Sequence, residues 1–203
     1  MPSRNCGYYT AKYDFANKTH NIFLVQHLNL LKNMTVAEAK SLLATCSFTE
    51  QETWTDLGCG NGIFAYALAE LLAKGSSIYA IDKQKQHLSQ THNQISILFN
   101  QANFSDETLN IKPLNGILMA NSLHFIANPE KLINRLENYF ASDNKKWIII
   151  EYDHFLASQW EPYPMPFDKL KTLFKQLGYT TTRKIAERKS VFGGKMYAAF
   201  FCK

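Results

Sequence analysis

Three glycines recur at every second position in one short segment, Asp56-Leu57-Gly58-Cys59-Gly60-Asn61-Gly62. Glycines at such a turn let the backbone approach a ligand closely and let a following helix pack against a sheet. Sites for nicotinamide and flavin cofactors show a different spacing, G-x-G-x-x-G. The segment therefore predicts a strand-to-helix turn that binds a nucleotide-like ligand other than these dinucleotides.

Asp82 stands at the end of the next apolar run, Ile78-Tyr79-Ala80-Ile81. A carboxylate at the end of the second strand after a glycine turn can accept hydrogen bonds from both hydroxyls of a ribose. The alternative is that Asp82 only caps the helix that we expect next. Its position relative to the glycine turn favours ribose binding.

Together these features resemble the opening motifs of class I S-adenosylmethionine-dependent methyltransferases, which carry D-x-G-x-G-x-G followed by an acid. Two later segments match the same family, namely Gln101-Ala102-Asn103-Phe104 and the run from Ile117 to Phe125. The resemblance covers residues 53–150. It departs from the family in the polar first strand, Thr53-Trp54-Thr55, where a continuous apolar run is usual.

The resemblance implies that S-adenosylmethionine is the cofactor. It also implies that the Asn103 side chain accepts a hydrogen bond from the adenine amino group, while the Phe104 backbone N–H meets a ring nitrogen. A plain turn asparagine is the alternative reading of Asn103. The residues that we expect at the cofactor are Asp56, Gly58, Cys59, Gly60, Asn61, Asp82, Lys83, Asn103, Phe104, Asn121 and Ser122.

His124 follows the expected fourth strand, where the resemblance places the methyl acceptor. An imidazole with an ordinary pKa of about 6.5 suits removal of a proton from an oxygen or nitrogen acceptor. We therefore expect His124 to be the catalytic base. The alternative is a loop histidine that packs beneath the acceptor region or hydrogen-bonds a carbonyl.

Aromatic and acidic residues elsewhere are expected to line the acceptor site. The aromatic run from Tyr8 to Phe15 is predicted either to close over the cofactor as a lid or to anchor the first helix to the core. The residues that we expect to bind substrate are Tyr9, Tyr13, Glu151, Tyr152, Trp160 and Tyr163.

The acceptor itself is not determined by these motifs, since one fold serves many substrates. Asn121-Ser122-Leu123-His124 lacks the Pro-Pro-aromatic sequence of enzymes that methylate amino groups of nucleic acids, and the lysines form no basic stripe. We therefore expect a small-molecule acceptor and no nucleic-acid partner. A catalytically silent cofactor-binding subunit is the alternative function, whereas a nicotinamide oxidoreductase disagrees with the glycine spacing. The oligomeric state stays open.

Apolar runs alternate with helical segments from Glu52 onwards, which predicts an α/β fold with right-handed crossovers. We expect a doubly wound, mostly parallel, seven-stranded sheet that ends in an antiparallel hairpin turning at Phe192-Gly193-Gly194. A polar helix is predicted over Lys83 to Asn93, and Asn128 with Pro129 should begin another helix. The expected organisation is a single domain over residues 1–203, with a helical lid at 1–50 and a Rossmann-like core at 51–203.

Composition limits the class of protein further. The 203 residues are 46% hydrophobic, enough for a substantial core, and the formal charge is +5. The four cysteines show no metal-ligand spacing, so we expect reduced thiols and no metal. Without a signal peptide or an apolar run of about 18 residues, the sequence predicts a soluble cytoplasmic protein with no membrane contact.

Overall fold

A computed structural model describes residues 34–190 and 194–203. Most of the predicted helical lid, the aromatic run from Tyr8 to Phe15 and the predicted turn residues Phe192 and Gly193 lie outside these residues. Contacts group Val36–Lys203 into one unit. Its helices are α2 (Val36–Leu43), α3 (Ile63–Ala69), α4 (Pro129–Leu136) and α5 (Phe167–Gln176), with short 3-10 turns η1 (Leu123–Phe125) and η2 (Glu137–Tyr139). Its strands are β1 (Thr53–Leu57), β2 (Ser77–Asp82), β3 (Thr91–His92), β4 (Ile95–Gln101), β5 (Gly116–Ala120), β6 (Lys146–Tyr152), β7 (Thr181–Lys189) and β8 (Lys195–Cys202).

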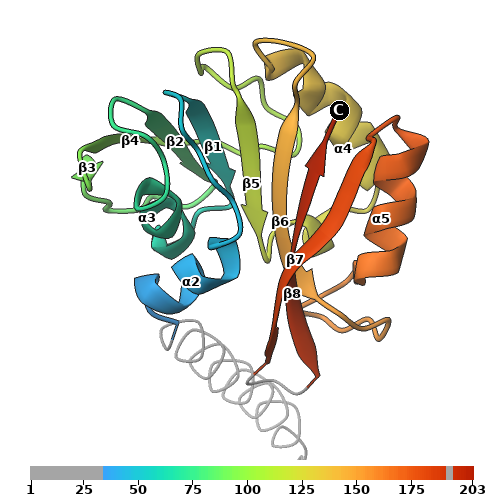
Figure 1. The fold of residues 1–203 in the computed structure, drawn as a ribbon. Coiled ribbons are helices and arrows are strands. Elements are labelled where there is room, and N and C mark those ends of the chain that lie inside the picture. Colours follow the sequence, from blue (N-terminus) through green and yellow to red (C-terminus); the bar gives the residue numbers. More distant parts are fainter. Residues whose placement is uncertain (1–33, 191–193) are drawn as a thin grey trace, which may run out of the picture. The chain divides into compact units, whose positions relative to one another are not determined.

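One mixed sheet of eight strands forms the centre of the unit, in the order β3-β4-β2-β1-β5-β6-β8-β7 (Figure 1). The pairs β4-β2, β2-β1, β1-β5 and β5-β6 are parallel, whereas β8 runs antiparallel between β6 and β7. This confirms the predicted α/β class, the parallel centre and the antiparallel end. The eighth strand is β3, which the sequence did not predict.

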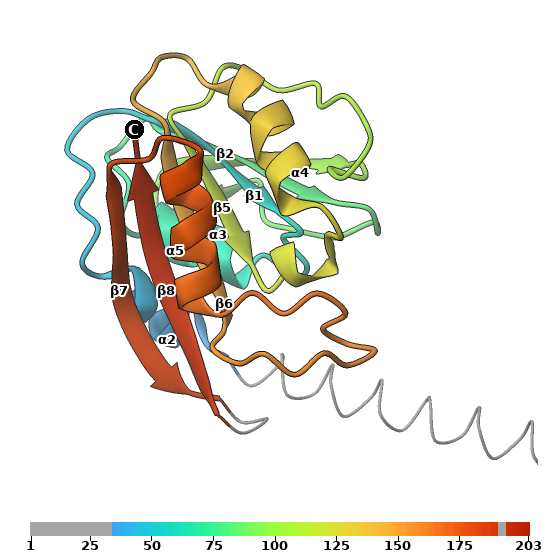
Figure 2. The same ribbon diagram turned by 90° about the vertical axis from the view of Figure 1, so that its right-hand side faces the viewer.

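The direction in which successive strands are added to the sheet reverses at β1, and this reversal determines which helices cover each face. The crossover through α3 leads from β1 toward β2, and the crossover through α4 leads from β5 in the opposite direction, toward β6. Right-handed crossovers in opposite directions place their helices on opposite faces. Helices α4 and α5 share the core cluster built on β5 and β6 and lie together on one side (Figure 2). The carboxyl ends of β1 and β5 are thus the switch point at which ligands bind in such sheets.

The predicted helix over Lys83 to Asn93 is wrong. The segment after β2 is irregular and then forms β3, which pairs antiparallel with β4. Tertiary contacts override the local helix preference here: the Ser89 backbone N–H donates to the Tyr66 hydroxyl at 2.9 Å. Asn93 and Gln94 adopt positive φ angles of 49° and 65°, which turn the chain back into β4.

The predicted start of α4 is confirmed. The Asn128 side chain accepts a hydrogen bond from the Lys131 backbone N–H at 2.9 Å, and Pro129 occupies the first helical position. Helix α3, after the glycine turn, ends at Ala69. No helix among the described residues has both the length and the apolar character needed to cross a membrane.

The pairing of β1 with β5 depends on Gly116, which faces Trp54 across the two strands. A Cβ atom on Gly116 would lie 2.3 Å from the fully buried Trp54 ring. Overpacking of this kind destabilises a protein by about 1–3 kcal/mol. We expect Gly116→Ala to lower the free energy of unfolding by that amount in urea denaturation. The penalty should be smaller in a Trp54→Phe background, and equal penalties in both backgrounds would contradict this account.

Candidate active site

The glycine turn between β1 and α3 adopts a backbone conformation that is unfavourable for residues other than glycine. Gly58 and Gly62 have φ angles of 80° and 81°, in the left-handed region. A Cβ atom on Gly58 would lie 2.6 Å from the Ser122 Cβ, and one on Gly62 would lie 2.9 Å from the Leu88 side chain. The glycines therefore let the turn approach the end of β5 on one side and the segment after β2 on the other.

Asp82, at the end of β2, holds the glycine turn in place. Its Oδ2 accepts a hydrogen bond from the Gly60 backbone N–H at 2.9 Å, and its Oδ1 accepts one from the Gln84 N–H at 2.8 Å. No helix follows Asp82, so it does not act as the helix cap that was the alternative prediction. Each carboxylate oxygen keeps a further lone pair for a ligand hydroxyl.

Asp56 is a buried carboxylate in the middle of the sheet, at 1% exposure. Neither of its oxygens has a hydrogen-bond partner among the described residues. Burial, and then the nearby charge of Asp82, raise the pKa of Asp56 to about 7. The Ala65 backbone amide opposes this shift in part. A cationic ligand group next to Asp56 would compensate its charge.

Asn121 and Ser122 connect β5 to the same turn. The Ser122 hydroxyl donates to the Leu57 carbonyl at 2.7 Å, which joins the ends of β5 and β1. Asn121 has a positive φ of 52°, and its buried Oδ1 has no hydrogen-bond partner among the described residues. Unsatisfied buried polar atoms are uncommon and indicate a ligand or water partner. Asn121 thus offers a hydrogen-bond acceptor next to Ser122, which contacts the glycine turn.

A second turn, Asn103–Glu107, follows β4. The Asn103 Oδ1 accepts hydrogen bonds from the backbone N–H and hydroxyl of Ser105, at 3.2 and 2.8 Å. This is the turn geometry that was the alternative prediction for Asn103. The half-buried Phe104 ring lies 3.5 Å from the position that a Cβ on Gly58 would take. The structure therefore brings Phe104 to the glycine turn.

The remaining predicted cofactor residues surround the same turn. Cys59 is buried, whereas Asn61 and Lys83 are exposed. The Asn61 side chain accepts a hydrogen bond from the Ile63 N–H at 3.4 Å, and the Lys83 carbonyl accepts one from the Gln101 side chain at 3.2 Å. The Asn61 side chain therefore stabilises the local backbone, and the Lys83 side chain faces solvent.

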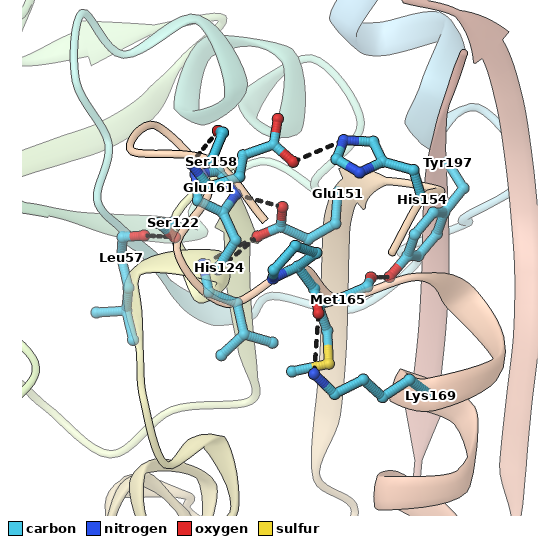
Figure 3. Close-up of polar contacts among 12 residues, drawn as sticks. Leu57, Ser122, His124, Glu151, His154, Ser158, Glu161, Met165, Lys169 and Tyr197 are labelled. Carbon is cyan, nitrogen blue, oxygen red and sulfur yellow. Dashed lines mark hydrogen bonds and ion pairs between the residues drawn. The ribbon is translucent and has the colours of Figure 1, made fainter. Parts of the chain in front are cut away.

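His124 and Glu151 form a buried pair at the carboxyl ends of β5 and β6 (Figure 3). The His124 Nδ1 lies 2.6 Å from the Glu151 Oε2. The other carboxylate oxygen accepts hydrogen bonds from the Leu123 and His124 backbone N–H groups, at 3.0 and 3.2 Å. A carboxylate at Nδ1 keeps the proton there and leaves Nε2 as the basic nitrogen. The sequence predicted both residues for the site but did not predict that they pair.

The segment after β6 folds back over this pair. The Tyr163 backbone N–H donates to the His124 carbonyl at 3.0 Å, and His154 pairs with Glu161 at 2.9 Å. Tyr152 is buried, with its ring centroid 6.4 Å from that of His124. Trp160 is partly exposed and lies on the same segment. Four of the six predicted substrate residues therefore lie near His124 or on the segment that covers it, while Tyr9 and Tyr13 fall outside the described residues.

Opposing effects set the pKa of His124. Burial lowers it, but the charge and hydrogen bond of Glu151, with a smaller effect of the Glu161 charge, raise it above its usual value. Burial also raises the pKa of the Glu161 carboxyl, against the opposing charges of His154 and His124. The imidazole is therefore a stronger base than free histidine.

Two further observations concern ligands. Within residues 34–190 and 194–203, no group of three or more potential ligand side chains could hold a metal ion. A cavity of about 550 Å³ lies between α4 and α5, lined in part by Asn128, Phe155, Met165 and Lys169. No predicted site residue lines this cavity.

The sequence profile of a methyltransferase domain matches residues 48–188. The chain belongs to this methyltransferase family. The match confirms the resemblance drawn from the glycine turn and Asp82, and it identifies the protein as an enzyme. A search of curated protein sequences gives no match to this methyltransferase.

Solved structures of methyltransferases share the fold at low sequence identity. A Burkholderia thailandensis 1,6-didemethyltoxoflavin-N1-methyltransferase, with its substrate and S-adenosylhomocysteine bound, is 15% identical with a TM-score of 0.65. The alignment covers 100% of this chain and 94% of that one. Human N-acetylserotonin methyltransferase in complex with S-adenosylmethionine is 20% identical with a TM-score of 0.60, over 81% of this chain and 51% of that one. An Aquifex aeolicus methyltransferase is 16% identical with a TM-score of 0.58, covering 81% and 89%.

Asp56 makes stability depend on pH in a way that can be measured. Because its native pKa of about 7 exceeds its ordinary value of 3.8, the native state binds more protons than the unfolded state between these values. The stability of the ligand-free enzyme should therefore fall as pH rises from about 4 to about 7. Asp56→Asn removes the buried charge, so it should stabilise the protein at pH 8, by at most about 4 kcal/mol, and change little at pH 4.

Urea denaturation at these two pH values tests this prediction. The exposed Asp106→Asn is the matched control for the loss of one carboxylate. An Asp56→Asn variant that is less stable than the wild type at pH 8 would contradict the assignment of a raised pKa.

Proposed function

We propose that this methyltransferase transfers a methyl group from S-adenosylmethionine to an oxygen or nitrogen of a small-molecule acceptor. The observation that carries the proposal is the buried Asp56 carboxylate beside the glycine turn, which has no hydrogen-bond partner within residues 34–190 and 194–203. S-adenosylmethionine is a cation with an ammonium group and a sulfonium group, and a buried carboxylate favours such a partner.

The donor would be held by the two turns and the strand ends. Asp82 is suited to accept the ribose hydroxyls, the Asn103–Glu107 turn to meet the adenine, and Asp56 with the Asn121 Oδ1 to bind the cationic methionine end. Bound S-adenosylmethionine supplies a sulfonium, which is a good leaving group for the methyl carbon. Residues of the chain must then exclude water and align the acceptor atom with that carbon.

His124 is suited to remove the acceptor proton. Its Nε2 makes no hydrogen bond to the described residues, while Nδ1 is held by Glu151. The pair fixes the tautomer and the ring orientation, and the carboxylate stabilises the imidazolium that forms when the proton arrives. Such a pair has no evident use in a silent binding subunit, which favours catalysis over that alternative.

A small aromatic acceptor agrees with the surroundings of His124. Phe125 and Tyr163 remain 53% and 43% exposed beside the pair, so they offer apolar contact to a flat ligand. Two of the similar enzymes carry the names of such acceptors, 1,6-didemethyltoxoflavin and N-acetylserotonin. These observations support a small molecule over a nucleic acid.

Calorimetric titration of the purified chain tests the proposed function. We expect S-adenosylmethionine and S-adenosylhomocysteine to bind at sub-millimolar concentration, and NAD not to bind. Methyl transfer from labelled donor to a panel of phenols, hydroxy acids and aromatic amines should then identify the acceptor class. Failure of both methyl-donor compounds to bind would overturn the proposal. Donor binding without transfer to any class of acceptor would support the silent subunit.

Once an acceptor is known, the pH dependence of turnover tests the role of the pair. Because His124 acts as a base, turnover should rise as pH passes upward through its raised pKa. Glu151→Gln removes the charge that raises the pKa, so the inflection should move to lower pH and the plateau should fall by about 10²–10⁴-fold. S-adenosylhomocysteine affinity should stay near the wild-type value. An unchanged inflection and plateau would exclude the pair as the base.

A further inference from the structure

The connection from β4 to β5 contains no regular helix in this chain. Residues 102–115 cross from one strand to the other as turns and extended segments. Backbone groups in such a connection need partners other than those of a regular helix. Side chains of α4 and η2 provide several of them: the Tyr139 hydroxyl, for example, accepts the Leu109 N–H at 2.8 Å.

Arg135, on the last turn of α4, holds the part of this connection that follows β4. Its Nη1 donates to the Glu107 carbonyl at 2.8 Å, and its Nη2 donates to the Phe104 carbonyl in a shorter contact. One guanidinium thus bridges two carbonyls of the Asn103–Glu107 turn. The planar fork of donors is the geometry that arginine provides and lysine does not.

The turn is also closed from within. The Glu107 N–H donates to the Asn103 carbonyl at 3.0 Å, and the Glu107 carboxylate accepts the Asn103 N–H at 3.1 Å. The Phe104 N–H makes no hydrogen bond to the described residues, although Arg135 fixes the carbonyl of the same residue. The turn therefore offers a backbone donor whose position is set by contacts on either side of it.

We propose that Arg135 is a positioning residue for the donor, and that it pre-organises the Asn103–Glu107 turn for the adenine. This inference rests on the proposed function, which brings the adenine to Asn103 and Phe104. The guanidinium itself touches no ligand. It removes the need to order the turn when the ligand binds, and pre-organisation of this kind increases affinity without adding a contact.

The consequence is confined to the adenosine end of the ligand. Loss of Arg135 should weaken the binding of S-adenosylhomocysteine and of 5′-methylthioadenosine by the same factor, since both compounds carry the adenine. Loss of the Asp56 charge should weaken the binding of S-adenosylhomocysteine only, since 5′-methylthioadenosine has no amino-acid end and therefore no α-amino group. The two variants thus separate the two ends of the site.

Calorimetric titration of Arg135→Gln with both compounds tests the proposal. We expect the dissociation constants to rise about tenfold or more, with the binding stoichiometry unchanged. Arg135→Lys keeps the charge but cannot bridge both carbonyls, so this variant should bind both compounds several-fold more weakly than the wild type. Lys131→Gln removes an exposed charge one turn earlier on α4 and should leave the affinity unchanged.

Each outcome decides the matter. A merely structural role would lower the melting temperature and the stoichiometry and leave the dissociation constants of the folded fraction unchanged, which would overturn the proposal. If Arg135→Gln does not fold, wild-type affinity in Arg135→Lys would overturn it as well. Wild-type protein that binds neither compound would overturn the proposed function, and the inference with it. If the wild type binds both compounds and the Arg135 variants bind them with the same dissociation constants, the inference alone would be overturned.

Discussion

A hydrogen bond from the Ser122 hydroxyl to the Leu57 carbonyl joins the ends of β5 and β1, and the arrangement of the site depends on this contact. It brings the loop that carries His124 against the glycine turn, with Gly58 too close to Ser122 for any side chain. The two strands are neighbours because the chain reverses its winding direction at β1. Sheet topology, the Ser122 hydrogen bond and the absence of a side chain at Gly58 therefore act together to bring the ends of β1 and β5 into one site.

Two buried carboxylates in this region, Glu151 and Asp56, differ in the hydrogen bonds that they accept. Glu151 accepts three hydrogen bonds from the His124 loop, so its burial is compensated within the chain. The Asp56 oxygens accept no hydrogen bond from the residues that the structure describes, and burial raises the pKa of this carboxyl. Burying a charge without a partner is strongly unfavourable, so a fold that retains Asp56 loses stability when no ligand is bound. The proposed binding of a cationic ligand at Asp56 would compensate for this loss.

Much of this could be predicted from the sequence where a local pattern has a single structural meaning. The alternate glycines, the acid after Ile81 and the Asn128-Pro129 cap each depend on near neighbours in the chain, and each lies where the sequence placed it. The helix expected after Asp82 does not form, because the hydroxyl of Tyr66, 23 residues before Ser89, accepts a hydrogen bond from the Ser89 backbone N–H. Pairs such as His124 with Glu151 could not be predicted, since they depend on which strands become neighbours. The same is true of Arg135, whose partners lie 28 and 31 residues earlier.

A crystal structure with S-adenosylhomocysteine tests the central claim most directly, because each end of the ligand should lie against a separate part of the chain. We expect the amino group within hydrogen-bonding distance of the Asp56 carboxylate, the ribose hydroxyls on Asp82, and the adenine against the Phe104 backbone N–H. A ligand found in the cavity between α4 and α5, or one whose amino group lies away from Asp56, would contradict the account.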